Sequence, residues 1–163
     1  MSPSGGTARR RKNAWPTRLL ALPDGNLFVF GFLVHYPWEL LQVPLFAGLG
    51  EAPHWEAVKF CSGAALGDAA LTVVAYWLAA MVAGRRWIFE LPGRAVAVYL
   101  AAGLIATIGL EWVNAEVLGR WEYTGAMPTL PLLGTGLSPL AQWLVLPLLV
   151  LGIVSRQLRG TAR

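Results

Sequence analysis

The sequence predicts an all-α membrane protein, a bundle of four transmembrane helices with both chain ends on the cytoplasmic side. Its 163 residues are 56% hydrophobic and only 13% charged, whereas soluble domains are about 25% charged. Basic residues gather at alternate ends of the apolar segments, as membrane topology requires. The apolar segments predict four spans, at about 26–46, 58–83, 95–117 and 138–154. This length leaves room for one compact bundle and no second domain.

The thirteen Lys and Arg residues divide unequally between the two ends of the predicted bundle. Eleven lie in three stretches, 9–18, 85–94 and 156–163, and the other connections hold only Lys59 and Arg120. Because Lys and Arg accumulate in cytoplasmic loops, both termini and the middle loop are predicted to be cytoplasmic. The net charge of +4 then reflects topology. We expect membrane lipids as partners and no nucleic acid.

Both ends of the chain are predicted to be basic tails. Residues 1–24 form a cytoplasmic tail followed by a segment at the membrane interface, and residues 156–163 form a second cytoplasmic tail. The apolar run 19–22 is too short for a signal peptide, and no A-x-A cleavage site follows it. We therefore expect the N-terminal tail to be retained in contact with anionic lipid.

The first predicted span carries polar side chains at membrane depth. On a helix, His35, Glu39 and Gln42 fall within about 60° of one another. A carboxylate inside a membrane is costly, so it normally faces the interior of the bundle and has a partner there. The other spans are expected to supply the partners of Glu39.

The second and third spans each add a carboxyl group. Asp68 directly follows Gly67. Gly63 and Gly67 form a G-x-x-x-G pair, which permits the close approach of another helix. Glu111 shares one face of the third span with Asn114. Both acids fall in the middle or outer half of the membrane.

An outer loop of about twenty residues, 118–137, joins the third and fourth spans. Loops of this length without structure of their own are often functional. Its aromatic residues Trp121 and Tyr123 are predicted to cap the mouth of the bundle. The alternative is that both rings anchor the loop at the membrane interface.

The fourth span is predicted to be short or broken near Gly134–Pro139. Ser138 and Pro139 have the residue types of an N-cap and a first helical position. A helix from Pro139 to Val154 has 16 residues and is roughly 24 Å long, shorter than a hydrocarbon core of about 30 Å. Either the bilayer thins there or residues 132–137 enter the membrane as irregular backbone.

These depths predict one polar cluster in the outer half of the bundle. Its acids are Glu39, Asp68 and Glu111. Three acids in a low-dielectric site do not all ionise without a cation, so at least one is expected to hold a proton. The predicted supporting residues of the pocket are His35, Gln42, Asn114, Trp121, Tyr123, Ser138 and Gln142.

Several chemistries suit such a cluster, and the sequence leaves the cofactor unknown. A protonated carboxyl donates a proton to an apolar double bond or works as an acid/base pair, with Glu39 and Asp68 as candidates and Glu111 tuning them. Three carboxylates and His35 suit a divalent metal. Transport of ions or protons is a third hypothesis, and axial ligation of a pigment or haem by His35 is a fourth. Alternatively the acids pair with the neighbouring amides and only hold the bundle together.

The whole chain resembles a group of small four-span bacterial inner-membrane proteins with no assigned chemistry. This resemblance implies a multi-pass protein of a bacterial inner (cytoplasmic) membrane. The residues that carry it are Pro37-Trp38-Glu39, Gln42-x-Pro44, Gly67-Asp68, Glu111, Arg120-Trp121-x-Tyr123, Met127-Pro128, Gly136-Leu137-Ser138-Pro139 and Gln142.

More weakly, the chain is similar to half-units of membrane lycopene cyclases and carotenoid hydratases. Those families show a Trp-acid pair, then Trp-x-Tyr, a Gly-containing loop and a Pro that opens the next helix. Trp38-Glu39, Trp121-x-Tyr123 and residues 134–139 fit that outline. The cyclases continue with Pro-x-Glu-Glu, whereas this chain has Pro139-Leu140-Ala141-Gln142. No catalytic role is therefore carried over.

The leading hypothesis is an integral inner-membrane protein that binds or transforms a lipid or isoprenoid by acid/base chemistry. Its expected partners are membrane lipids, a hydrophobic small molecule, and another membrane protein or a second copy of the chain. The alternative is a non-catalytic structural or accessory subunit of a larger membrane complex.

Overall fold

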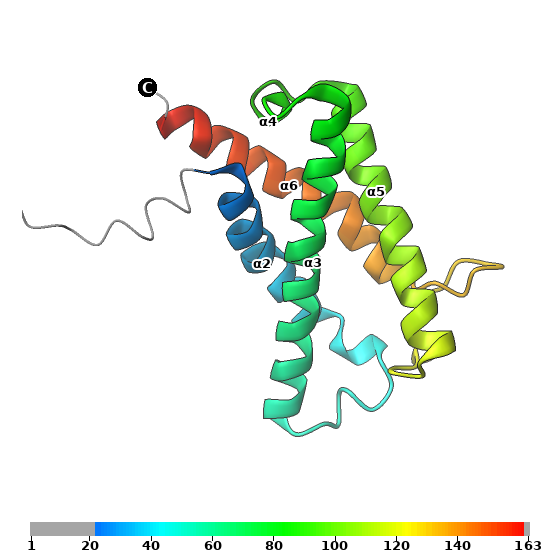
Figure 1. The fold of residues 1–163 in the computed structure, drawn as a ribbon. Coiled ribbons are helices and arrows are strands. Elements are labelled where there is room, and N and C mark those ends of the chain that lie inside the picture. Colours follow the sequence, from blue (N-terminus) through cyan, green and yellow to red (C-terminus); the bar gives the residue numbers. More distant parts are fainter. Residues whose placement is uncertain (1–21, 162–163) are drawn as a thin grey trace, which may run out of the picture.

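The computed structural model describes residues 22–161 of the chain. In that part the fold is helical, and its only β-type pairings are two isolated bridges. Four long helices pack against one another (Figure 1). The elements in chain order are α2 (Pro23–Leu41), η1 (Val43–Leu45), α3 (His54–Ala83), α4 (Trp87–Glu90), α5 (Gly93–Trp112), η2 (Val113–Val117) and α6 (Leu137–Thr161). Most of the predicted N-terminal tail lies outside the described residues.

Three of the described helices are long and apolar enough to cross a membrane: α3, α5 with its continuation to Val117, and α6. The first predicted span, α2, is not among them. Its 19 residues include Asn26, His35 and Glu39, which are buried inside the bundle. Buried polar side chains lower the hydropathy of a helix even where its outer face is apolar.

The first helix ends earlier than the sequence predicts, at Leu41 instead of residue 46. Pro44 has no amide hydrogen to donate and disfavours a helical conformation at Val43. The chain turns there through η1, a single turn of 3₁₀ helix. Gln42 therefore lies at the C-terminal cap of α2, with its backbone N–H bonded to the carbonyl oxygen of Trp38.

The fourth helix begins inside the predicted interval 134–139, but the prediction of a short helix is wrong. α6 runs from Leu137 to Thr161, 25 residues or about 37 Å. Pro147 lies inside it without ending it. The helix also continues beyond Val154 into the basic segment, where Arg159 Nη2 donates to Ser155 Oγ (3.0 Å) and caps part of the last turns.

The bundle is packed differently at its two ends. At the end that carries α4, an apolar core joins α3, α4, α5 and α6, with Tyr76, Trp87 and Tyr99 in contact at its centre. α3 and α5 lie close together at this end and diverge toward the other (Figure 1). The diverging end is the one that holds η1, the start of α3 and loop 118–136.

Candidate functional site

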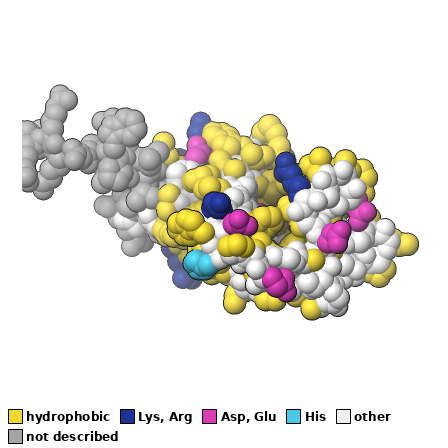
Figure 2. Space-filling view, turned by 90° about the horizontal axis from the view of Figure 1, so that it is seen from below, with side chains coloured by type: hydrophobic (Ala, Val, Ile, Leu, Met, Phe, Trp, Pro, Cys, Tyr) yellow, Lys and Arg dark blue, Asp and Glu magenta, His cyan; other side chains and the backbone are white. Residues whose placement is uncertain are grey.

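A cavity of about 650 Å³ occupies the diverging end of the bundle. Its sides are α3 and α5, and α2, α6 and loop 118–136 contribute the remaining wall. The end view in Figure 2 shows hydrophobic, acidic and basic side chains mixed on a hollowed surface. The apolar side chains of the lining are Phe46, Phe60, Ala64, Leu71, Leu110, Pro139 and Trp143, with Trp121 at its edge. Such a size and lining are common in ligand pockets, which occupy roughly 300–1,000 Å³.

The G-x-x-x-G pair permits the close approach of a helix but makes no such contact among residues 22–161. A Cβ placed on either Gly63 or Gly67 would meet no atom within 4 Å. Both glycines line the cavity instead. Because glycine has no side chain, these two positions leave part of the cavity volume between α3 and α5 open.

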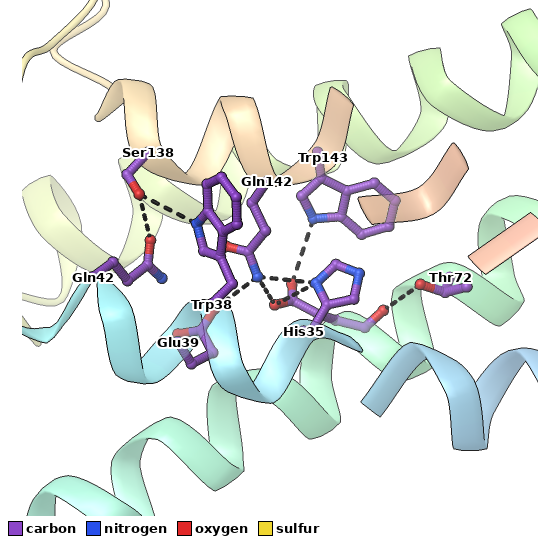
Figure 3. A network of polar contacts seen from close by, with 9 residues as sticks. His35, Trp38, Glu39, Gln42, Thr72, Ser138, Gln142 and Trp143 are labelled. Atoms are coloured by element: carbon purple, nitrogen blue, oxygen red, sulfur yellow. Dashed lines mark hydrogen bonds and ion pairs between the residues drawn. The ribbon is translucent and has the colours of Figure 1, made fainter. Parts of the chain in front are cut away.

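Four buried or partly buried polar residues from three helices form a group that we call the Gln142 cluster: His35, Glu39, Asp68 and Gln142. Gln142 Nε2 lies at its centre, 2.8 Å from Glu39 Oε1, 2.9 Å from Asp68 Oδ2 and 2.9 Å from His35 Nδ1. Figure 3 shows the side chains of His35 and Glu39 converging on the Gln142 amide of α6. The cluster therefore ties α2 and α3 to α6.

The proton count of the Gln142 cluster restricts the tautomer of His35. An amide nitrogen carries two hydrogens, but Gln142 Nε2 lies within hydrogen-bond distance of three atoms, so it donates to at most two of them. The count is satisfied when Gln142 donates to Glu39 and Asp68 and His35 Nδ1–H donates to Asp68 Oδ2, 3.2 Å away. His35 Nε2 is then left buried with no hydrogen-bond partner in the described part of the chain.

Glu39 and Asp68 share one donor, which places two carboxyl groups side by side. Two ionised carboxylates repel each other strongly where the dielectric constant is low. A single proton held by the pair removes this repulsion. Such a pair can give up and take back one proton, as general acid/base catalysis requires.

The other oxygen of Asp68 faces an indole. Trp143 Nε1 donates to Asp68 Oδ1 at 3.4 Å. The Trp143 ring lies directly on Gly103 of α5, where a Cβ would come 2.0 Å from Trp143 Cε3. Only glycine at position 103 admits the indole in this place. The contact thus joins α5 to the cluster through Trp143.

A second polar group, the Glu111 group, consists of Glu111, Trp121 and Tyr123. Trp121 Nε1 and the Tyr123 hydroxyl both donate to Glu111 Oε2. The Tyr123 oxygen in turn accepts from the backbone N–H of Gly136 at 3.2 Å. Burial raises the pKa of Tyr123 above its ordinary value, and the Glu111 carboxylate raises it further. Tyr123 is therefore a stable donor to Glu111 at neutral pH, and its bond holds the loop against α5.

Three further hydrogen bonds fix the rim of the cavity. Ser138 Oγ donates to Gln42 Oε1 at 2.9 Å and accepts from Trp38 Nε1 at 3.3 Å, which fastens the start of α6 to the end of α2. On the other side, Arg120 Nη1 donates to Asn114 Oδ1 at 3.1 Å. Asn114 belongs to the π-helical turn η2. Such turns occur frequently at functional sites.

The predicted site residues fall into two groups around one cavity rather than one cluster. Seven of them line it: Glu39, Gln42, Asp68, Glu111, Asn114, Trp121 and Gln142. The other three, His35, Ser138 and Tyr123, do not line it, but each contacts a residue that does. Both aromatic residues of the loop bond to Glu111, which favours a capping position over simple interfacial anchoring.

The residues of the site that were not among the predicted ones include Trp38, Lys59, Gly103, Arg120 and Trp143. Gly103 is visible in the sequence as a glycine inside the third predicted span, but nothing there indicates its contact with Trp143. Lys59 and Arg120 are visible in the sequence as isolated basic residues at the predicted outer end of the bundle. There they were used only to predict the membrane topology. Nothing in the sequence shows that the two indoles bond to Ser138 and Asp68.

The described residues contain no group of three or more His, Cys, Asp or Glu side chains that could hold a metal ion. These features define a class: a helical protein with three helices apolar enough to cross a membrane and a cavity lined by carboxyl groups. No protein-family model, curated protein or solved structure matches the chain.

Proposed function

We propose that the chain is an integral protein of a bacterial inner membrane, with α2, α3, α5 and α6 as four spans and both termini in the cytoplasm. The distribution of basic residues supports this orientation. α2 supports it as well, because it packs along α3 and α6 and keeps its polar side chains inside the bundle. In this orientation the cavity faces the outer half of the membrane.

The proposed function is binding of a lipid or isoprenoid in the cavity. The observation that carries it is the combination of apolar walls with three carboxyl groups, Glu39, Asp68 and Glu111, in one cavity of about 650 Å³. An apolar wall accepts a hydrocarbon chain, because burial removes that chain from water or from less tightly packed lipid. Burying carboxyl groups among apolar walls costs free energy, so such groups occur mainly where they have a function.

The proposed chemistry is transfer of a proton to and from the bound chain. The carboxyl that holds the proton of the Glu39–Asp68 pair donates it to one carbon of a double bond. A carboxylate then removes a proton from a neighbouring carbon, so that the double bond moves and the pair regains its proton. Glu111 lines the same cavity and is held by Trp121 and Tyr123 as a positioned charge. This scheme requires no metal.

Native mass spectrometry of the gently extracted full chain tests the proposal. We expect a bound lipid or isoprenoid in the wild-type protein, and Glu39→Gln should retain the fold and the ligand but abolish its conversion. Glu116→Gln is the matched control, since Glu116 is exposed and does not line the cavity. A wild-type protein extracted under the same conditions without any hydrophobic ligand contradicts the proposal.

The second candidate is a non-catalytic subunit of a larger membrane complex. One observation favours it: the Gln142 cluster joins α2, α3 and α6, so Glu39 and Asp68 already have a structural role. The apolar window of α5 is only 17% buried inside the chain, which leaves a large face for another protein. If Glu39→Gln causes misfolding or loss of assembly and no chemistry is missing, this candidate replaces the first.

A further inference from the structure

Lys59 and Arg120 are isolated basic residues that meet at one cavity. Lys59 is the only Lys or Arg between residues 42 and 84, and Arg120 is the only one between residues 95 and 155. They come from different segments, α3 and loop 118–136, yet both line the cavity described above. Both side chains are exposed at its rim. The same cavity therefore has carboxyl groups in its wall and two cations at its mouth.

Neither Lys59 nor Arg120 forms an ion pair with a carboxylate among residues 22–161. The ion pair found among residues 22–161 is that of His35 and Asp68. A Lys or Arg on the surface of a soluble protein needs no partner, because water solvates it. At the edge of an apolar cavity, however, two cations without carboxylate partners create a positive potential directed at whatever enters.

The Arg120 side chain is held in position. Its Nη1 donates to Asn114 Oδ1 at 3.1 Å, and its backbone N–H donates to the Asn114 carbonyl oxygen at 2.8 Å. Asn114 is itself fixed by a bond from Nδ2 to the Leu110 carbonyl oxygen at 2.7 Å. Gly119 makes the reversal of the chain possible through its positive φ of 57°. The remaining guanidinium donors have the planar arrangement that binds two oxygens of one anion.

Lys59 lies on the face of α3 that also lines the apolar part of the cavity. Lys59, Gly63 and Gly67 recur at intervals of four residues, so they lie along one face of α3. The two glycines leave open space beside the helix. An amphiphile with its charged end at Lys59 therefore has a clear path for its chain along α3.

From this arrangement we propose that Lys59 and Arg120 bind the phosphate headgroup of an amphiphile whose hydrocarbon chain occupies the cavity. This inference rests on the proposed function and names the substrate class, a lipid or isoprenoid phosphate ester. A carboxylate offers only two oxygens, which one guanidinium satisfies. A phosphate monoester offers three oxygens and up to two negative charges, which suit a bidentate Arg and a point-charge Lys together. The acids deeper in the cavity then face the chain and not the headgroup.

The experiment compares two probes that differ only in the headgroup, farnesyl monophosphate and farnesol. Both are titrated into the purified full chain in detergent and followed by native mass spectrometry, with inorganic phosphate as a third probe. We expect farnesyl monophosphate to bind at least tenfold more tightly than farnesol. Lys59→Gln and Arg120→Gln should each weaken the phosphate ester about tenfold, as expected for loss of a charged hydrogen bond. Farnesol binding should be unchanged in both.

The control variant is Arg94→Gln, which removes the same charge at the start of α5, at the opposite end of the bundle. It should leave the affinity for both probes unchanged. If Arg120→Gln fails to fold, Lys59→Gln still tests the inference. Lys59 is exposed, and its replacement leaves the Asn114–Arg120 bonds intact.

The possible outcomes separate the headgroup inference from the proposed function. Equal affinity for the two probes, unaffected by either variant, overturns the headgroup inference and leaves the lipid pocket standing. Absence of binding by both probes overturns the inference and counts against the pocket itself. Displacement of the ester by an equal concentration of inorganic phosphate shows a site for a free anion and contradicts the proposal of an amphiphilic ligand. A tenfold preference lost in both variants supports the inference.

Discussion

The indole of Trp143 in α6 lies directly on Gly103 of α5. A Cβ on Gly103 would lie 2.0 Å from Trp143 Cε3 and 2.2 Å from Cζ3. We expect Gly103→Ala to push the indole away from Asp68 and to destabilise the bundle by about 1–3 kcal/mol, as overpacking does. A thermal unfolding measurement in detergent checks this.

Gly109→Ala is the matched control on the same helix. A Cβ there meets nothing within 4 Å, so the change should be neutral or slightly stabilising. If the two variants unfold at the same temperature, Trp143 does not lie on Gly103 as described.

Gln142 should be essential for the packing of α6. Gln142→Leu removes the shared donor of Glu39 and Asp68 and leaves two buried carboxyl groups facing an alkyl chain. We expect a loss of about 3 kcal/mol or more, because buried charged groups without partners are costly. Thermal unfolding in detergent measures this loss.

A double variant tests whether the missing hydrogen bond causes the loss. Glu39→Gln added to Gln142→Leu supplies an amide donor next to Asp68 and removes one of the two acids. It should recover part of the stability. A double variant less stable than Gln142→Leu alone would contradict the hydrogen-bond assignment.

Tyr123 makes the stability of the loop depend on pH in the alkaline range. Its pKa in the folded chain is raised by burial and by Glu111, whereas in the unfolded chain it is about 10. Its contribution is therefore fully present below pH ~10 and is lost as the pH rises toward the folded value. The gap in unfolding temperature between wild type and Tyr123→Phe should be constant from neutral pH to about pH 10 and should narrow above it. A gap that widens with pH would contradict this assignment.

The cavity can be filled without touching an acid. Gly67→Leu places a side chain into open space that lines the cavity, so we expect a folded protein that has lost the affinity for hydrophobic ligands. Gly109→Leu, at an open position that does not line the cavity, should keep that affinity. Native mass spectrometry of the two variants gives the comparison. Full ligand occupancy in Gly67→Leu would place the ligand elsewhere.

The orientation of the chain can be tested by labelling single cysteines in intact cells on a Cys61→Ser background. Ala52→Cys and Gly125→Cys should react with a membrane-impermeant maleimide from outside. Gly160→Cys should react only after the cells are permeabilised. Labelling of Gly160→Cys in intact cells contradicts a cytoplasmic C-terminus. Protection of Ala52→Cys would show that α2 does not cross the membrane.

The sequence predicts the helical elements well, because membrane helices are long and apolar and their ends are marked by Pro, Gly and basic residues. Its error on α6 comes from treating Ser155 and Arg156 as the end of the helix, although a helix can extend beyond the hydrocarbon region. The first helix ends early because Pro44 disfavours a helical conformation at the preceding residue, although the hydrophobic pattern continues beyond it.

The site is predicted less completely than the fold. Helical periodicity brings Glu39, Asp68 and Gln142 to inward faces, and the structure places them on one amide nitrogen. Periodicity does not give the rotation and tilt of one helix against another. For that reason Glu111 was expected beside the other two acids, whereas it bonds to the loop residues Trp121 and Tyr123. The family resemblances and the reaction stay predictions.

The divergence of α3 and α5, which leaves the cavity between them, affects how the affinity of a ligand has to be expressed. In the proposed membrane orientation, a hydrophobic ligand enters the cavity from the bilayer and does not have to dissolve in water first. Its occupancy is then set by its mole fraction among the lipids, and a modest intrinsic affinity is enough to fill the site. In detergent the same ligand is diluted by micelles, so apparent dissociation constants will rise in proportion to the detergent concentration. Values obtained from different preparations become comparable only when they are expressed as mole fractions.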